Sequence, residues 1–267
     1  MENIASVENI TLEGTFGDKK VLVCRCAPNE PNGVNIALMH GVHSSANFHR
    51  TNKFRALAEC LAGAGFSPWL IETSRKVRNR HDYAGDWVED AFGGKTFPQE
   101  QEDVFAALRH IIAAVGDAAL WIWGFSLGGI IALSAAASDK FARRPGKDYA
   151  FDALVLGGTG LVSYPEVEEH MLKLPVLSTL RAVLSPDMVS EIKTGMFISF
   201  RGENDEIFPK EQCVKLVDDV PLPADKKYFY PVPGADHGLR VRDGKNDPSV
   251  MQEMTEVLKK ALKSSLW

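Results

Sequence analysis

Trp121–Ser138 reads WIWGFSLGGIIALSAAAS, and this stretch decides the fold. An apolar run stops at Gly124, Ser126 follows two residues later, and two more glycines precede a second apolar run. The first run is typical of a short buried strand, and the second continues at the length of a helix. The stretch therefore predicts a strand, a tight turn that carries one hydroxyl group, and a helix.

The spacing of the glycines around Ser126 suits a nucleophile. A nucleophile on a very tight strand-to-helix turn has a strained backbone, and its neighbours must be small so that the strand and the helix can approach each other. Such a turn lifts the hydroxyl clear of the sheet and places it at a helix N-terminus, where free N–H groups favour negative charge. In a second interpretation, the glycines serve only backbone packing and Ser126 caps the helix. The partners available to Ser126 distinguish the two.

Strands alternate with helices from residue 35 onward, after an N-terminal hairpin formed by Val7–Leu12 and Val21–Cys26. This alternation predicts an α/β fold, with a mostly parallel sheet and helices on both faces, as one domain over residues 1–267. The apolar residues of the segment 73–97 show no clear helical or strand period. Residues 161–194 have helix-like apolar spacing and several prolines, and we expect them to form a small cap above the edge of the sheet. The expected strands are Asn35–Gly41, Ser67–Glu72, Ala119–Trp123, Phe151–Gly158, Met196–Phe200 and Lys226–Val232, and the expected helices are Lys53–Ala64, Pro98–Val115, the run after Ser126, and Ser249–Lys263.

Composition limits the classes of function. The chain has 267 residues, of which 45% are hydrophobic and 24% charged, and its net charge is −5. This balance argues against general binding of nucleic acid or of an anionic membrane, because both need excess basic surface. No stretch has the length and apolar character of a signal peptide or a membrane span, so the cytoplasm is the expected compartment. The four cysteines lack zinc-like spacing, so we interpret them as reduced thiols and expect no metal site.

Two loops at strand ends offer partners for Ser126. A serine hydroxyl needs a base, and the base needs a carboxylate that orients it. Asp205 follows the strand MFISF, and His237 follows the strand KKYFYPV. Catalytic groups in open parallel sheets gather at the carboxyl ends of the strands. The order Ser126, Asp205, His237 therefore predicts a catalytic triad. Other acids nearby are expected to face solvent (Glu203 and Glu206) or to cap a helix (Asp187).

Acyl transfer also requires two N–H donors that point at the oxyanion of the tetrahedral intermediate. The amide of Leu127, directly after Ser126, is one candidate. The amide of Val42, in the stretch LMHGVHSS after a predicted strand, is the other. His40 in the same stretch is expected to brace this loop through hydrogen bonds.

Together these motifs resemble the α/β-hydrolase superfamily. The matching pieces are HG at 40–41, GFSLGG at 124–129, GENDEIFP at 202–209 and GADHGL at 234–239, in order and over nearly the whole chain. The resemblance implies an eight-stranded, mainly parallel sheet, a cap after the sixth strand, and the triad Ser126–Asp205–His237. Dehalogenases and epoxide hydrolases of this superfamily usually carry an aspartate where Ser126 stands, so their chemistry is not expected. The small cap and the HGVHSS loop resemble compact cinnamoyl and feruloyl esterases.

The expected reaction is hydrolysis of a carboxylic ester, with a small-molecule acyl substrate and an acyl-enzyme on Ser126. It needs no metal or organic cofactor. The same residues suit a thioesterase, an amidase or peptidase, a perhydrolase or an acyltransferase. A ligand-binding protein is the alternative from another class, because a fold does not fix a function.

Three sets of residues are candidates for contact with substrate. The first set lies near the predicted mouth of the site: His43, Phe48 and His49. The second set, in the cap, either lines an acyl pocket or packs the cap onto the body: Leu172, Leu174, Leu177 and Leu180. The third forms either a basic lip for an anionic substrate or a solvated loop whose two halves neutralise each other: Arg75, Lys76, Arg78 and Arg80, followed by Asp82, Asp86, Glu89 and Asp90.

Overall fold

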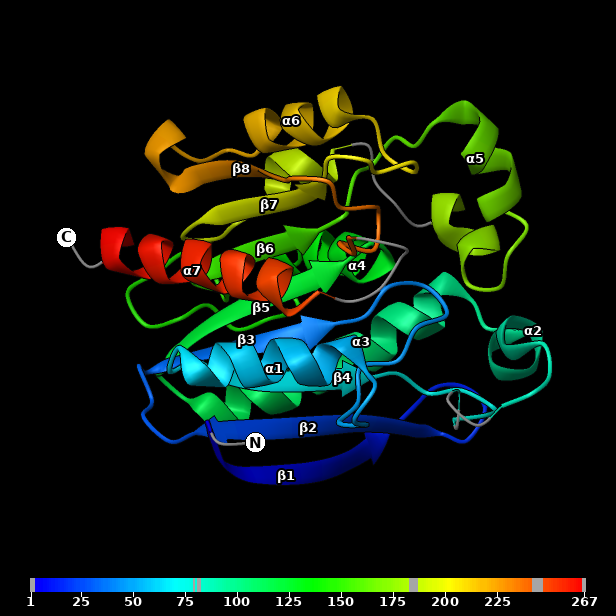
Figure 1. Ribbon diagram of the computed structural model, residues 1–267, viewed down its shortest axis with the longest axis horizontal. Coiled ribbons are helices and arrows are strands. Elements are labelled where there is room, and N and C mark those ends of the chain that lie inside the picture. Colours follow the sequence, from blue (N-terminus) through cyan, green and yellow to red (C-terminus); the bar gives the residue numbers. More distant parts are fainter. Residues whose placement is uncertain (1–2, 79, 81–82, 183–186, 242–246, 266–267) are drawn as a thin grey trace.

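An eight-stranded sheet forms the centre of the molecule, and helices cover both of its faces (Figure 1). The computed structural model describes residues 3–78, 80, 83–182, 187–241 and 247–265. The strands are β1 (Ile4–Glu13), β2 (Lys20–Pro28), β3 (Val34–Met39), β4 (Ser67–Glu72), β5 (Ala119–Phe125), β6 (Ala153–Gly157), β7 (Phe197–Gly202) and β8 (Lys227–Val232). The α-helices are α1 (Lys53–Gly63), α2 (Trp87–Phe92), α3 (Phe97–Val115), α4 (Leu127–Ala136), α5 (Pro165–Met171), α6 (Lys210–Asp219) and α7 (Pro248–Ser265), and the short 3-10 helices are η2 (Leu177–Ala182), η3 (Met188–Glu191) and η4 (Ala224–Lys226).

The strands lie side by side in the order β1-β2-β4-β3-β5-β6-β7-β8. β1 pairs with β2 and β2 with β4 in antiparallel fashion, whereas all the remaining neighbours are parallel. The interior strands β3, β6 and β7 are buried along their whole length, as expected of parallel strands covered on both faces. The prediction of an N-terminal hairpin followed by a mostly parallel sheet is confirmed.

Each face of the sheet has its own apolar core. On one face, α1 packs against α7, and Phe54 of α1 and Leu258 of α7 join strand residues such as Trp123. On the other face, α3, α4 and α6 contribute residues such as Leu108, Ile131 and Leu216 to a second core. Figure 1 shows α1 and α7 in front of the sheet and α3 and α4 behind it. Because both faces are closed, space for a polar site lies at the ends of the strands.

The helix that follows Ser126 is buried on nearly all sides. Every residue of α4 except Ser134 is buried, as expected of an apolar helix inside a protein core. At 10 residues α4 is short. Within the described ranges, no helix combines the length and the apolar character that crossing a membrane requires.

The loops that carry the predicted site residues leave one end of the sheet. β3, β5, β7 and β8 end at Met39, Phe125, Gly202 and Val232, respectively. The cap, residues 161–194, connects β6 to β7, and its described parts contain α5, η2 and η3. Figure 1 shows α5 and α2 beyond the carboxyl ends of the parallel strands, far from the two ends of the chain. The cap therefore stands over the strand ends.

Two helices lie in stretches for which the sequence predicts none. α6 occupies KEQCVKLVDD, in which Cys213, Leu216 and Val217 are the buried residues, and this apolar face is too narrow for its period to be recognised. α2 lies within residues 73–97 and is only six residues long. The one local signal for α2 is Asp86, whose side chain accepts hydrogen bonds from the amides of Val88 and Glu89.

Candidate active site

Ser126 lies on the turn between β5 and α4, in a conformation that few residues other than glycine adopt. Its φ is +51° and its ψ is −117°. Such a conformation costs about 1–3 kcal/mol and persists only where the surrounding structure imposes it. The side chain makes no capping bond to α4, and the backbone N–H donates to Gly157 O at 2.9 Å. The interpretation of Ser126 as a helix cap is therefore wrong.

Gly124 and Gly128 allow β5, α4 and the end of β3 to come together at this turn. A Cβ atom on Gly124 would lie 2.2 Å from the carbonyl oxygen of Gly128. A Cβ atom on Gly128 would lie 2.5 Å from the carbonyl oxygen of His40. Both distances are far inside van der Waals contact, so a side chain at either position would push the helix away from the strands. The close approach of three backbone segments explains the glycine spacing.

The side chains of Ser126, His237 and Asp205 meet, although they come from three different loops. Ser126 Oγ lies 3.0 Å from His237 Nε2. His237 Nδ1 lies 3.0 Å from Asp205 Oδ2 and 3.2 Å from Oδ1. Because a carboxylate only accepts hydrogen bonds, Nδ1 carries the hydrogen, and Nε2 is left to accept from the serine hydroxyl. This is the contact through which a histidine base removes a proton from a nucleophile.

Hydrogen bonds hold Asp205 as a buried carboxylate. The residue is 4% exposed, and its Oδ1 accepts from the amides of Ile207 at 2.8 Å and Phe208 at 3.0 Å. Burial by itself raises the pKa of Asp205, but the hydrogen bonds from His237, Phe208 and Ile207 outweigh this effect and hold the pKa below its ordinary value. The carboxyl group therefore stays ionised near neutral pH and orients the imidazole.

The other acids considered for this role have different contacts. Glu203 and Glu206 are exposed, but Glu203 accepts from the amide of Gly234 at 2.9 Å and Glu206 from the amide of His237 at 3.4 Å. They therefore join the loop after β7 to the loop after β8, which the expectation of solvent-facing side chains missed. Asp187 precedes η3, but its side chain makes no capping bond there, so that expectation is corrected. Its neighbour Pro186 lies outside the described residues.

The two residues whose amides are predicted to bind the oxyanion both line the apolar pocket together with Ser126. Leu127 is the first residue of α4, where a backbone N–H has no partner within the helix. The loop that carries Val42 passes close to the nucleophile, since a Cβ atom on Gly41 would lie 3.3 Å from Ser126 Cβ and 3.9 Å from Ser126 Oγ. Among the described residues, no protein acceptor for the amide of Val42 is found. Both amides are thus available to a ligand.

His40 braces the loop of Val42, as the sequence predicts. It is 4% exposed, its Nδ1 lies 2.8 Å from Gly41 O, and its Nε2 lies 3.1 Å from Arg75 Nη2. A guanidinium only donates, so Nε2 is the acceptor and Nδ1–H donates to Gly41 O. Burial, assisted by Arg75 and opposed by Glu100, lowers the pKa of His40 to about 4. His40 is therefore a neutral brace of fixed tautomer.

A buried ionic cluster is hydrogen-bonded to this brace. Lys95 Nζ lies 2.5 Å from Glu100 Oε2 and 2.9 Å from Asp103 Oδ2, and all three side chains are almost completely buried. Glu100 in turn accepts from Thr73 Oγ1 at 3.0 Å, and the backbone carbonyl of Thr73 accepts from Arg75 Nε at 3.0 Å. The cluster connects α3 to the brace of the Val42 loop, and no sequence pattern predicted it.

Two cavities open beside Ser126, and both are lined by Ser126 and Val42. The polar pocket has a volume of about 360 Å³. It is lined by Gly41, Val42, Ser44, Ser45, Thr51, Asn52, Lys53, Arg80, Phe125, Ser126, Gly157, His237, Gly238 and Arg240. Sequence reasoning missed Lys53 and Arg240, because a lysine at a helix start and an arginine in a loop read as ordinary surface residues.

The apolar pocket has a volume of about 100 Å³ and lies under the cap. Leu127, Ile130 and Phe208 form its inner wall, and Leu172, Leu177 and Leu180 come from the cap. Leu174 packs instead against the core beside α3 and α4. Leu177 and Leu180 also pack against that core, so these two residues both line the pocket and hold the cap on the body.

His43 and Phe48 do not line either cavity. The ring of His43 packs against Phe92, and its Nε2 lies 3.1 Å from Pro175 O, so it ties the Val42 loop to the cap. The ring of Phe48 lies under the guanidinium of Arg55, 4.9 Å from ring centre to Cζ. The prediction that these two residues contact substrate is not supported by their placement, because each is engaged by a neighbouring element.

The basic residues of the segment 73–97 separate into different roles. Arg75 is completely buried in the brace, and Lys76 donates to Gly93 O at 2.7 Å. Arg78 pairs with Asp18 and with Glu72, which lie outside the acidic half of the segment. Arg80 alone among the four lines the polar pocket. Asp82 lies outside the described residues, so its part in the predicted neutralisation is not described.

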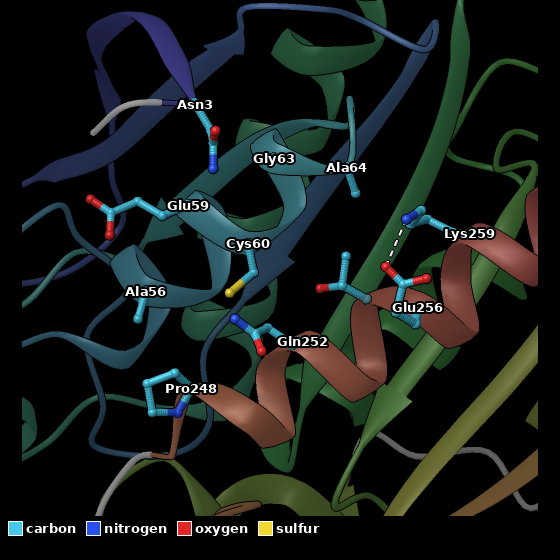
Figure 2. A pocket seen from close by; sticks show the side chains of 11 residues that line it. Asn3, Ala56, Glu59, Cys60, Gly63, Ala64, Pro248, Gln252, Glu256 and Lys259 are labelled. Atoms are coloured by element: carbon cyan, nitrogen blue, oxygen red, sulfur yellow. Dashed lines mark hydrogen bonds and ion pairs between the residues drawn. The ribbon is translucent and has the colours of Figure 1, made fainter.

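A larger groove between α1 and α7 shares no lining residue with the cavities at Ser126. Its volume is about 770 Å³, and Figure 2 shows Cys60 of α1 facing Gln252 of α7 across it. The nearby Lys259 is paired with Glu256 at 2.7 Å. Burial and the charge of Glu59 raise the pKa of the Cys60 thiol, which disfavours the reactive thiolate. The groove is therefore a poor candidate for covalent catalysis.

Solved structures similar to this chain have the same architecture over nearly their whole length. The esterase domain of a Rhodothermus marinus protein is 18% identical with a TM-score of 0.62, and the match covers 96% of this chain and 97% of that one. Est1E from Butyrivibrio proteoclasticus is 14% identical with a TM-score of 0.64, covering 97% and 98%. A soluble variant of monoglyceride lipase from Saccharomyces cerevisiae is 15% identical with a TM-score of 0.65, covering 98% of each chain. No family model and no curated protein matches the sequence.

The chain has the α/β-hydrolase fold, and the prediction of this fold is confirmed. At identities of 14–18% these matches establish the fold alone. The chemistry of the site has to be inferred from the side chains around Ser126.

Proposed function

We propose that the protein is a serine hydrolase that cleaves carboxylic esters, with Ser126 as nucleophile, His237 as base and Asp205 as orienting acid. The observation that carries the proposal is the contact of 3.0 Å between Ser126 Oγ and His237 Nε2, on a strained turn where the hydroxyl does not cap the helix. A strained, uncapped serine beside an oriented imidazole has a physical reason in catalysis, because backbone strain is commonly kept where it positions a reacting group.

The reaction proceeds in two steps, acylation of Ser126 and hydrolysis of the acyl-enzyme. In the first, Ser126 Oγ attacks the acyl carbon while its proton moves to His237 Nε2, and the amides of Val42 and Leu127 bind the oxyanion. The bond from the acyl carbon to the alcohol oxygen breaks, and His237 gives its proton to that oxygen. In the second, water attacks the acyl-enzyme, its proton moves to His237, the bond to Ser126 Oγ breaks, and Oγ regains the proton. One oxyanion donor contributes about 10²–10³ in rate.

The similar folds support ester chemistry as the first candidate. Est1E is known with ferulic acid bound, and the yeast monoglyceride lipase with a substrate analogue. The apolar pocket beside Ser126 offers a place for an acyl group, which supports acyl transfer over a site for a purely polar ligand. Cleavage of a thioester or an amide uses the same five groups, so these bonds are the alternatives within the enzyme class.

A panel of 4-nitrophenyl esters of increasing acyl length, combined with labelling by a serine-directed fluorophosphonate, tests the proposal. We expect turnover of the short esters and stoichiometric labelling of Ser126, and we expect Ser126→Ala to abolish both while its circular dichroism spectrum stays that of the parent. Ser134→Ala, on the helix that follows Ser126, is the matched control and should be labelled normally. A parent protein with neither turnover nor label would favour a ligand-binding protein, and full activity in Ser126→Ala would remove Ser126 as nucleophile.

A further inference from the structure

The polar pocket beside Ser126 carries an unbalanced positive charge. Three cationic side chains line it, Lys53, Arg80 and Arg240, and no carboxylate is among its lining residues. Arg240 is paired with Asp236 at 2.9 Å. For Lys53 and Arg80, no carboxylate within ion-pairing distance is found in the part of the chain that the structure describes. Two cations therefore face the pocket without a countercharge there.

Lys53 is held in place, although no carboxylate binds it. Its ammonium group lies 5.0 Å from the ring centre of Phe125 and 5.4 Å from that of Phe54, and its Nζ is 3.4 Å from Gly238 O. Phe125 directly precedes the nucleophile, and Gly238 directly follows His237, so the ammonium stands next to the reacting groups. Cation–π contacts leave most of the donor capacity of an ammonium unused.

The cations repel one another. Burial, together with Arg240 and Arg80, lowers the pKa of Lys53 to about 8, although Asp236 opposes this effect. Burial and Arg240 also lower the pKa of Arg80. Arg80 donates to a neutral partner, His43 O, at 3.0 Å. An anion placed between these groups would relieve the repulsion and would be attracted by the field of the pocket.

The position of His237 decides which part of an ester enters this pocket. The leaving oxygen must receive its proton from His237, and His237 lines the polar pocket but not the apolar one. The acyl carbon must sit between Ser126 and the amides of Val42 and Leu127, and all three residues line the apolar pocket. The acyl chain therefore points under the cap, and the alcohol points toward Lys53.

From this arrangement we propose, on the basis of the proposed ester hydrolysis, that the substrate is an ester of an apolar acyl group with an alcohol that carries an anionic group, a carboxylate or a phosphate. Lys53 and Arg80 bind that anion in the polar pocket, and the residues under the cap bind the acyl chain. The apolar pocket suits an uncharged acyl chain, because Leu127, Ile130 and Phe208 form its inner wall. The two charged residues that also line it, Glu168 and Arg181, form an ion pair with each other, so neither charge is left for an anionic acyl end.

The test compares two esters that differ in one charge on the leaving group: 4-(butanoyloxy)benzoate and its methyl ester. Each kcat/KM, measured at low ionic strength, is divided by the rate constant of the same ester with hydroxide, and the ratio of the two results gives the charge preference. We expect a preference of about tenfold or more for the carboxylate, and we expect Lys53→Met to lower it about tenfold, as for a hydrogen bond to a charged group. Arg80→Met, at an exposed position, should lower it about threefold.

Lys76→Met is the matched control. It removes the same charge from the segment that carries Arg80, but Lys76 is exposed and lines neither cavity, so the charge preference should change less than twofold. A second comparison, 4-nitrophenyl hemisuccinate against 4-nitrophenyl butanoate, moves the charge to the acyl end and should show the opposite preference.

The failure of this inference is distinguishable from the failure of the proposed function. Turnover of the neutral ester with a charge preference near one, unaltered by Lys53→Met, would overturn the inference and leave the esterase proposal standing. A preference for the hemisuccinate would place the anion at the wrong end of the site and would also overturn it. Absence of turnover of both benzoate esters, with no fluorophosphonate label, would remove both proposals.

Discussion

Two histidines stand at strand ends beside the same serine, and their surroundings give them opposite properties. His237 follows β8, its side chain is 19% exposed, and its ring joins a carboxylate on one side to a hydroxyl on the other. His40 follows β3, is 4% exposed, and has a guanidinium on one side and a backbone carbonyl on the other. Asp205 stays ionised and accepts a hydrogen bond from His237 Nδ1, whereas burial and Arg75 lower the pKa of His40 to about 4.

The difference shows that the partners of an imidazole decide whether it is placed beside a hydroxyl that can give up a proton or only fixes the geometry of a loop. The cluster around His237 is open to the polar pocket, so a substrate can reach it. The cluster around His40 rests on Lys95 and Glu100 and is closed to solvent. We call the first the reactive cluster (Ser126, His237 and Asp205) and the second the supporting cluster (His40, Arg75, Glu100 and Lys95).

The largest expected effect tests the acid of the reactive cluster. Asp205→Asn should lower turnover of 4-nitrophenyl butanoate by about 10⁴ near neutral pH, because the histidine loses its tautomer and the support of its charged form. The controls Glu203→Gln, Glu206→Gln and Asp187→Asn should each cost less than about tenfold, since those side chains accept backbone bonds or lie in the cap. A folded Asp205→Asn enzyme with near-parent turnover, beside an inactive Glu206→Gln enzyme, would move the acid to another residue.

The supporting cluster should contribute measurably to the free energy of unfolding. Lys95→Met leaves Glu100 and Asp103 buried without their cation, so we expect the free energy of unfolding to fall by about 3–5 kcal/mol. Urea unfolding followed by tryptophan fluorescence measures this loss. Lys259→Met removes a lysine from an exposed ion pair with Glu256 and should cost less than about 1 kcal/mol. Equal losses in the two variants would mean that the buried cluster does not support the fold as described.

A substitution of His40 tests whether this residue only holds the Val42 loop in place or also exchanges a proton in the reaction. His40→Leu removes the hydrogen bond to Gly41 O and leaves Arg75 without its acceptor, so the amide of Val42 shifts and kcat should fall about 10–100-fold, part of the value of one oxyanion donor. KM should change little, and the shape of the pH–rate profile should stay that of the parent, because His40 is neutral above its pKa of about 4. A profile whose shape changes between pH 5 and 8 would show that His40 exchanges a proton in the reaction.

The smallest expected effect is a loss of the charge preference above neutral pH, where Lys53 gives up its proton. Lys53, with a pKa of about 8, is faced by Arg240 and Asp236 from the loop after β8 and by Arg80 from the loop after β4. The ammonium loses its charge as pH rises through that value, so attraction for an anionic leaving group is present at pH 7 and lost by pH 9. The charge preference between the two benzoate esters should therefore fall roughly severalfold from pH 7 to 9. A constant preference, or the same fall in Lys53→Met, would exclude Lys53 as the cause.

The local sequence pattern was sufficient to predict which residues form the reactive cluster. The strand, turn and helix around Ser126 lie in one continuous stretch. The alternation of strands and helices along the chain follows from the spacing of its apolar residues. Asp205 and His237 were predictable because parallel strands bring their carboxyl ends to one edge, whatever the details of packing. The glycines at 124 and 128 were predictable for the same local reason, since the turn itself requires close approach.

Only the tertiary structure decided the supporting cluster, the polar pocket and the cap. In sequence Arg75 belongs to a run of surface-like cations, yet it is completely buried, because His40 and Ser44 from another loop satisfy its donors. Lys53 and Arg240 lie 187 positions apart in the sequence. They line the same polar pocket only because folding brings α1 next to the loop after β8. The sequence by itself determined where the chain turns and which groups stand at those turns, because these depend on near neighbours. The partners of each charge depend on segments that folding brings together from far apart, and that is why burial and pairing, rather than residue type, fixed what each charged side chain does.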